Sequence, residues 1–127
     1  MPTIQKITVS RLISVFDGDT FRVDIDSWPR FFGHKIPIRI RGIDAPERRR
    51  PDKTEDPEAL KARDWLREKL INAKVITLEN LERCKYFRII ADVDVDGHNI
   101  AAELLRLGLA KPYKKTMLKN ERLSKWH

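Results

Sequence analysis

The chain has 127 residues and a net charge of +7, from 26 basic and 19 acidic side chains. This length predicts one domain, whose core can bury enough surface to fold without a disulfide or structural metal. Its single cysteine, Cys84, excludes an intramolecular disulfide, and with three scattered histidines it excludes a four-ligand zinc site. No apolar run approaches 18 residues, so no membrane span is predicted. We expect no signal peptide in this chain and leave its compartment open.

The first third of the chain predicts three strands. Residues 4–16 and 20–26 alternate apolar and polar side chains, and Asp17-Gly18-Asp19 between them is a hairpin-turn signal. Residues 27–33 contain a Trp-Pro pair and a glycine and are expected to be a loop. Residues 34–41 alternate again, and the proline within them indicates an edge strand or the start of a strand.

A charged loop and a helix are predicted next. Residues 47–56 are charged and contain a proline, as is typical of a surface loop. Asp56 followed by Pro57 predicts the N-cap and first position of a helix that runs to about Ala73. The apolar face of this helix is expected to consist of Leu60, Trp65, Leu66, Leu70 and Ile71.

The last elements complete the fold class. Residues 74–79 and 86–95 predict two more strands, Asp96-Gly97 a turn, and residues 99–107 a short helix ended by Gly108. This order is an α+β, mainly β pattern. A small, strongly curved sheet of five strands with two to three helices is typical of an OB-fold barrel.

One calcium motif is rejected on its context. Asp92, Asp94, Asp96 and Glu103 have the spacing of an EF-hand loop. The segment before them has the alternation of a strand rather than a helix, and Asn99 stands where the loop needs an apolar residue. We therefore interpret Asp92 and Asp94 as the solvent face of a strand.

The positive charge is concentrated in two places. Between Lys111 and His127 six basic and one acidic side chain give a net +5, and Arg48-Arg49-Arg50 form a second run. Clustered positive charge favours a polyanion, above all nucleic acid. The alternative is a solvated surface that keeps the protein soluble.

Three segments together carry the groups that phosphodiester hydrolysis needs: residues 17–20, 39–47 and 85–88. Two carboxylates suit a hard divalent cation, two arginines suit phosphate oxygens, and a third carboxylate suits a water molecule. These candidates are Asp19 and Asp44 for the cation, Arg39 and Arg88 for the phosphate, and Glu47 for the water.

The same segments carry a family resemblance. The chain contains V-F-D-G-D-T, R-x-x-x-x-D-A-P-E, P-E-A, K-Y-x-R and D-G-x-x-x-A-x-x-L-L-R-x-G-L-A, in that order. Over residues 10–113 it resembles the staphylococcal nuclease family. The resemblance implies a five-stranded OB-fold barrel with three helices, and a calcium-requiring enzyme that cuts DNA and RNA and leaves 3′-phosphates.

The resemblance also assigns roles to individual residues. It implies that Ca²⁺ is bound by the side chains of Asp19 and Asp44 and by the backbone carbonyl of Ala45. It implies that the catalytic residues are Arg39, Glu47 and Arg88, with Glu47 acting on the attacking water. Nucleic acid is expected to contact Lys85, Tyr86, Tyr113, Lys111, Lys114 and Lys115.

The sequence departs from the family pattern before its second arginine, where Phe87 replaces a glycine. The main alternative is therefore a catalytically weak or inactive nuclease-fold module that binds nucleic acid or a protein partner. A cold-shock-like binder would need several surface aromatics for stacking, and the chain has only ten aromatic residues. We expect a monomer whose partner is DNA, RNA or both.

Overall fold

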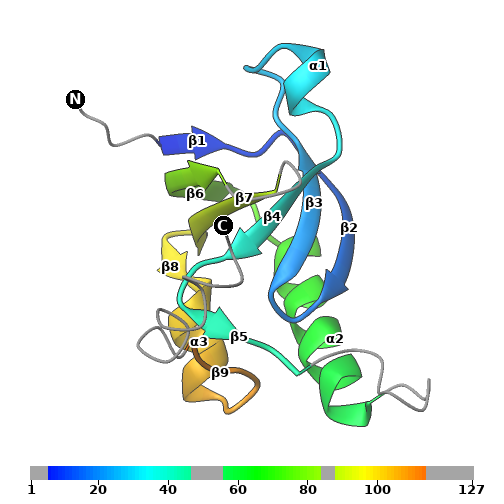
Figure 1. Cartoon of the computed structure of the whole chain (residues 1–127), viewed down its shortest axis with the longest axis vertical. Helices are drawn as coiled ribbons and strands as arrows, with labels where there is room; N and C mark the ends of the chain where they lie inside the picture. Colours follow the sequence, from blue (N-terminus) through cyan, green and yellow to red (C-terminus); the bar gives the residue numbers. More distant parts are fainter. Residues whose placement is uncertain (1–5, 47–55, 84–87, 114–127) are drawn as a thin grey trace, which may run out of the picture.

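The fold was analysed in a computed structural model, which describes residues 6–46, 56–83 and 88–113 (Figure 1). Nine strands and three helices are formed by these residues. In chain order they are β1 (Lys6–Thr8), β2 (Arg11–Asp17), β3 (Thr20–Asp24), α1 (Arg30–Gly33), β4 (Ile36–Ile40), β5 (Ile43–Asp44), α2 (Pro57–Ile71), β6 (Ile76–Arg83), β7 (Ile89–Val95), β8 (His98–Asn99), α3 (Ile100–Arg106) and β9 (Lys111–Pro112).

The main sheet is curled, with β1 and β2 at its two ends in the order β1-β6-β7-β4-β3-β2. Only Val9 and Ser10 separate these two end strands along the chain. The Val9 N–H bonds to the Ile76 carbonyl and the Ser10 N–H bonds to the Asp24 carbonyl, both at 2.9 Å. The first strand therefore bends and passes from one neighbour to the other, as Figure 1 shows. Counted as one bent strand, β1 and β2 join β3, β4, β6 and β7 in the five-stranded OB-type arrangement that the sequence predicts.

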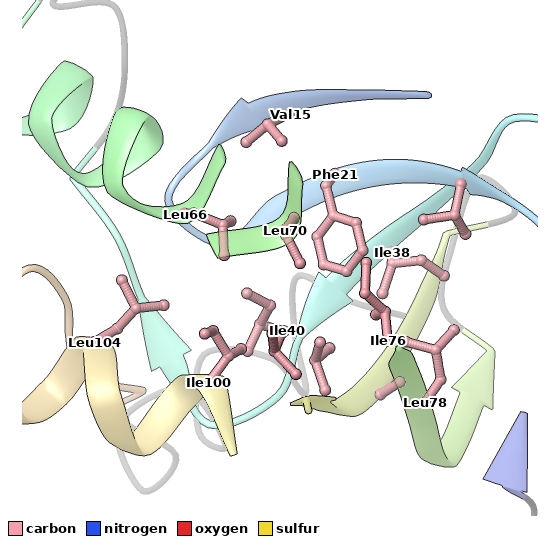
Figure 2. Packing of buried hydrophobic residues seen from close by; sticks show 14 of the residues in the cluster. Val15, Phe21, Ile38, Ile40, Leu66, Leu70, Ile76, Leu78, Ile100 and Leu104 are labelled. Atoms are coloured by element: carbon pink, nitrogen blue, oxygen red, sulfur yellow. The ribbon is translucent and has the colours of Figure 1, made fainter. Parts of the chain in front are cut away.

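The core lies inside the curled sheet and under two helices (Figure 2). Strand side chains that alternate inward, such as Phe21, Ile38 and Leu78, are fully buried. Leu66 from α2 and Leu104 from α3 are fully buried too and belong to the same apolar cluster. Burial of this apolar surface is the main force that holds the barrel and its two longer helices together.

Helix α2 begins where it was predicted, with the Asp56 side chain accepting the N–H of Glu58 at 2.9 Å. Its buried face differs from the prediction. Leu66 and Leu70 are buried as expected, whereas Ile71 is 59% exposed. Two alanines, Ala59 and Ala62, are completely buried instead. Small side chains let the helix approach the sheet closely, so the contact face contains residues that a search for large apolar side chains overlooks.

The proline of the third predicted strand, Pro37, marks a strand start rather than an edge. Strand β4 is central, antiparallel to β3 and parallel to β7. Pairing with β7 begins only at Ile38, so the missing N–H of Pro37 costs no ladder bond on that side. The predicted loop at 27–33 contains the short helix α1, which the sequence analysis missed.

The rejected calcium motif is a strand and a turn. Asp92 and Asp94 lie in β7, and Asp96-Gly97 form the turn that joins β7 to β8. The Asp96 carboxylate accepts the N–H groups of Lys74 and Val75, both at 2.9 Å. The predicted last helix is α3, and Gly108 follows it with a φ of 74°, as a helix-ending glycine should. No helix within the described ranges is long and apolar enough to cross a membrane.

Candidate active site

The hairpin turn between β2 and β3 carries the most buried carboxylate of the candidate site. Gly18 and Asp19 form this turn, and Asp19 is only 4% exposed. Its Oδ1 accepts the Thr20 hydroxyl at 2.9 Å, and its Oδ2 accepts the Ala45 N–H at 2.9 Å. Because buried carboxylates are costly without partners, this set of donors fixes where the Asp19 oxygens lie.

Arg39 on β4 forms an ion pair with Asp19. Register pairs Thr20 with Arg39, so the turn and the arginine are neighbours in the sheet. Arg39 Nη1 lies 2.7 Å from Asp19 Oδ2, and Nη2 lies 3.2 Å from Asp44 Oδ1. The guanidinium thus bridges the two carboxylates that the sequence predicts as cation ligands. Arg39 is largely buried, whereas Asp44 is 59% exposed.

Strand β9 and Tyr113, at the end of the described chain, also contribute to the site. Strand β9 pairs antiparallel with β5, with Lys111 opposite Asp44, and the Tyr113 N–H bonds to the Gly42 carbonyl at 3.0 Å. This pairing brings the Tyr113 ring over the guanidinium of Arg39, with 5.7 Å from Cζ to the ring centroid. Cation–π attraction at this distance helps to hold the guanidinium in place.

Close packing against α2 explains why the turn contains glycine. A Cβ on Gly18 would lie 2.8 Å from the Cβ of Ala62 and 2.9 Å from the Cβ of Ala45. The buried alanine of α2 therefore presses directly against the turn that carries Asp19. Sequence places these residues more than 40 positions apart, and only the fold brings them together.

The carboxylates of the turn titrate abnormally. Burial, together with a hydrogen bond to Asp19, raises the pKa of Asp17 to about 7. Burial alone would also raise the pKa of Asp19. Three interactions outweigh the effect of burial and lower the pKa of Asp19 below its usual value: the hydrogen bond with Asp17, the charge of Arg39 and the hydrogen bond from the Ala45 N–H. Burial would lower the pKa of Arg39, but the charge of Asp19 outweighs it and raises the pKa, so the bridging guanidinium stays charged.

Asp17 is the site residue that sequence reasoning missed. It was interpreted as part of a turn, yet its Oδ1 accepts the Asp19 N–H at 3.0 Å and its carboxyl is crowded against that of Asp19. The only sequence signal was the two-residue spacing of the acids, which does not reveal how deeply α2 buries the turn.

Arg88, the second predicted phosphate ligand, lies just before β7 and is partly buried. Ile90 pairs with Arg39 in the parallel β4–β7 ladder, and Arg88 is two residues earlier, so the strand alternation puts it on the same sheet face as Arg39. No ion pair or side-chain hydrogen bond joins Arg88 to the rest of the described chain. Five predicted site residues lie outside the described residues: Glu47, Lys85, Tyr86, Lys114 and Lys115.

The oxygen donors present suit a hard cation. Asp19 and Asp44 contribute carboxylates, and the carboxyl group of Asp17 lies beside that of Asp19. Within the described residues no three acidic, histidine or cysteine side chains are grouped to hold a metal ion. Because Ca²⁺ takes six to eight oxygens, water or substrate oxygens would have to complete such a shell.

Comparison with known proteins identifies the family of this chain. The family model described as "Staphylococcal nuclease homologue" matches residues 37–127. The curled OB-type sheet defines a protein of the OB-fold class. The chain belongs to the staphylococcal nuclease family.

Three relatives illustrate the similarity. The chain is 32% identical to "Probable endonuclease LCL3" of Colletotrichum graminicola, with 87% of this chain and 47% of the relative covered. It is 31% identical to "Thermonuclease" of Staphylococcus hyicus, with 80% and 57% covered. It is 33% identical to "Endonuclease YncB" of Bacillus subtilis, with 83% and 46% covered. The chain thus spans about half the length of these relatives.

Proposed function

We propose that this chain is a nuclease domain that hydrolyses phosphodiester bonds of DNA and RNA, requires calcium, and leaves 3′-phosphate ends. The observation that carries the proposal is the cluster in which Arg39 bridges Asp19 and Asp44 beside Tyr113. Family membership and relatives named as endonucleases and a thermonuclease support the same reaction class.

The charged groups of the cluster have complementary tasks in this proposal. Asp19, Asp44 and the Ala45 carbonyl would hold Ca²⁺, which when bound neutralises phosphate charge and acidifies a bound water. Arg39 offers its planar fork to the phosphate oxygens, and Arg88 adds a second guanidinium from the same sheet face. Both stabilise the negative charge that grows on the phosphate in the transition state. Glu47 is proposed to accept the proton of the attacking water.

One observation favours the alternative of a binding module without catalysis. Arg39 is already engaged by two carboxylates, so its charge is neutralised unless those carboxylates acquire another partner. A chain that never binds a cation would keep this arginine away from phosphate. The two candidates therefore differ in whether a divalent cation changes what the protein does to nucleic acid.

A cleavage assay separates the candidates. The protein is incubated with supercoiled plasmid and with single-stranded RNA in calcium, in magnesium and in EDTA, and the ends of the products are analysed. We expect cleavage of both substrates in calcium, none in EDTA, and 3′-phosphate ends. Intact substrate in calcium, with retained binding, would establish the binding module instead.

Calorimetric titration with Ca²⁺ tests the proposed ligands without relying on activity. Asp44→Asn should weaken calcium binding at least tenfold, because it removes one of two side-chain carboxylates from an open site. Asp94→Asn, on the solvent face of β7, is the matched control and should bind calcium like the wild-type chain. If Asp94→Asn abolishes binding and Asp44→Asn does not, the assignment of ligands is wrong.

A further inference from the structure

A groove of about 630 Å³ is lined by residues of helix α1 and of the segments next to it. Helix α1 lies at the opposite end of the molecule from α3 and from the start of α2 (Figure 1). We call it the α1 groove. The residues that matter for its chemistry are Trp28, Phe31, Phe32, Lys35, Pro37 and Arg83. None of them belongs to the carboxylate–arginine cluster described above.

Two aromatic rings of the α1 groove are unusually exposed. Phe31 is 89% exposed and Phe32 is 62% exposed, and their rings meet edge to face with centroids 4.8 Å apart. Single exposed apolar residues are common, but adjacent exposed rings that line a groove are typical of a binding surface. Trp28 adds a third, partly buried ring.

The segment that presents these rings is held firmly. The Ile25 N–H bonds to the Gly33 carbonyl at 2.8 Å, and the N–H groups of Phe32 and Gly33 both bond to the Pro29 carbonyl at 2.8 Å. A Cβ on Gly33 would collide with the Ile25 carbonyl oxygen, so the chain closes here only because that residue is glycine. The exposure of the rings is therefore a property of an ordered turn.

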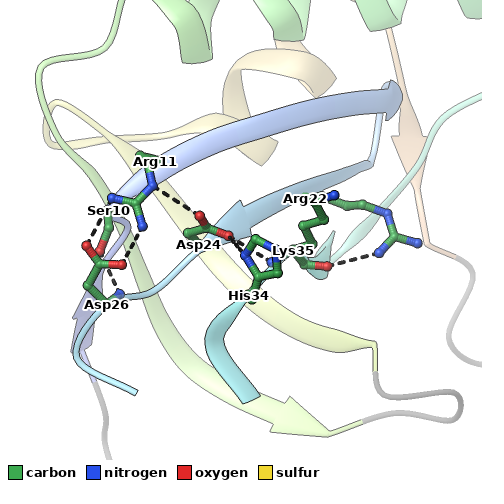
Figure 3. Close-up of polar contacts among 7 residues, drawn as sticks. All are labelled: Ser10, Arg11, Arg22, Asp24, Asp26, His34 and Lys35. Atoms are coloured by element: carbon green, nitrogen blue, oxygen red, sulfur yellow. Dashed lines mark hydrogen bonds and ion pairs between the residues drawn. The ribbon is translucent and has the colours of Figure 1, made fainter. Parts of the chain in front are cut away.

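A polar network fixes His34 and Lys35, which also line the α1 groove (Figure 3). The buried Asp24 carboxylate accepts the Lys35 N–H at 2.8 Å and lies 3.0 Å from Nδ1 of His34. Arg22 donates to the Lys35 carbonyl at 2.9 Å. These bonds hold Lys35 at a φ of 54°, a left-handed conformation that a lysine rarely adopts. Strained backbone held by its surroundings is found mostly at binding sites.

The charges of the α1 groove favour an anionic ligand with flat faces. Lys35 and Arg83 line it, and no acidic side chain does among its described lining residues. Asp24, which accepts the Lys35 N–H, is itself paired with Arg11 and His34. Aromatic rings beside positive charges are the elements with which proteins bind single-stranded nucleic acid, since bases stack on the rings and phosphates meet the cations.

The α1 groove and the candidate active site both involve strand β4. Pro37, which lines it, lies two residues before Arg39 on the same outward side of β4. Lys35 is four residues from Arg39, a distance of about 13 Å along an extended strand. The α1 groove and Arg39 are therefore close together along this part of the chain.

We propose that the α1 groove binds single-stranded nucleic acid, with bases stacked on Trp28, Phe31 and Phe32 and with phosphates at Lys35 and Arg83. This inference rests on the proposed function in one respect, because it treats the strand as continuous with the one at Arg39.

Binding measured without cleavage tests the inference. Fluorescence anisotropy in EDTA compares the full chain with Phe31→Ala/Phe32→Ala, using a labelled 12-nucleotide single strand and its duplex. The matched control, Ile71→Ala/Val75→Ala, removes two exposed apolar side chains from the C-terminal end of α2 and the residues after it. Circular dichroism and thermal melting verify that each variant is folded.

We expect the double phenylalanine variant to bind the single strand about 10- to 100-fold more weakly, since each stacked base contributes substantially. The duplex and the control variant should show changes below about twofold, because paired bases cannot stack on the rings. Lys35→Asn, which tolerates a positive φ, should lower the slope of log affinity against log salt by about 0.7.

Unchanged single-strand affinity in the phenylalanine variant would overturn the inference, whether or not the protein cleaves. Equal losses for single strand and duplex would overturn it too, since stacking would not be the cause. A variant that loses binding to anionic phospholipid vesicles but keeps its affinity for the oligonucleotide would identify a membrane contact instead. Wild-type binding through the α1 groove without any cleavage would leave the inference standing and refute the proposed nuclease.

Discussion

Asp19 and Arg39 form a buried ion pair across the β3–β4 ladder, with 2.7 Å between Asp19 Oδ2 and Arg39 Nη1. The same oxygen of Asp19 also accepts the Ala45 N–H, so the pair links the hairpin turn, β4 and the segment after β5. An ion pair held in this way fixes the guanidinium at the site, and a cation bound by the carboxylates would release its fork for a phosphate.

The close contact between the hairpin turn and α2 predicts an unusual mutational pattern. Gly18→Ala should destabilise the protein by about 1–3 kcal/mol, because its Cβ would overlap the side chain of Ala62. Combining it with Ala62→Gly should recover part of that loss, although glycine inside a helix itself costs about 1 kcal/mol. The quantity to measure is the free energy of unfolding in urea for both single variants and the double variant. Strictly additive losses would show that the two residues do not contact each other.

The network around Asp24 predicts a specific dependence of stability on pH. The Lys35 N–H, with Arg11 and His34, outweighs burial and holds the pKa of Asp24 below its usual value. A carboxyl group with a lowered pKa in the folded state stabilises the protein above its unfolded pKa of about 4. This stabilisation is lost as the pH falls through the lower, folded value.

Asp24→Asn should therefore be less stable than wild type between pH 5 and pH 7, the range above both pKa values. The difference should shrink below about pH 4. Urea unfolding of both proteins at a series of pH values measures it, with Asp94→Asn as the control on a solvent-facing strand position. A difference that stays constant down to pH 2.5 would mean that the Asp24 charge contributes nothing.

The ring of Tyr113 should matter to activity through Arg39. Tyr113→Leu removes the aromatic face from above the guanidinium and should lower kcat several-fold, since an exposed cation–π contact contributes about 0.5–1 kcal/mol. Tyr113→Phe keeps the face and should retain nearly full kcat. Steady-state rates on one oligonucleotide provide the comparison. An equal kcat for Tyr113→Leu and Tyr113→Phe would show that the ring does not support activity through Arg39.

The sequence predicts those parts of the structure that depend on local patterns. Alternation identifies the main strands, and Asp56-Pro57 identifies the start of α2. The motif spacing also selects Asp19, Arg39 and Asp44, which the fold does bring together. These features depend on residues close in sequence, or on motifs whose order is characteristic of the family.

Features that depend on tertiary packing escaped prediction. The pKa of Asp17 is raised by burial and by a hydrogen bond to Asp19, and Ala59 and Ala62 are buried in the contact face of α2. Helix α1 is a single turn without a capping side chain, so no periodic pattern marks it. Its exposed Phe31 contradicts the usual expectation that large apolar residues are buried.

The central claim is that Arg39 acts on the phosphate of a bound nucleic acid. The most direct test is the calcium-dependent kcat on a single-stranded oligonucleotide for wild type and Arg39→Lys, with Arg67→Lys on the exposed side of α2 as the control. A lysine keeps the charge but loses the planar fork, so Arg39→Lys should be about 10²–10³ slower while Arg67→Lys is unchanged. A rate for Arg39→Lys within a few-fold of wild type, or a wild-type chain that does not cleave in calcium, would contradict the account.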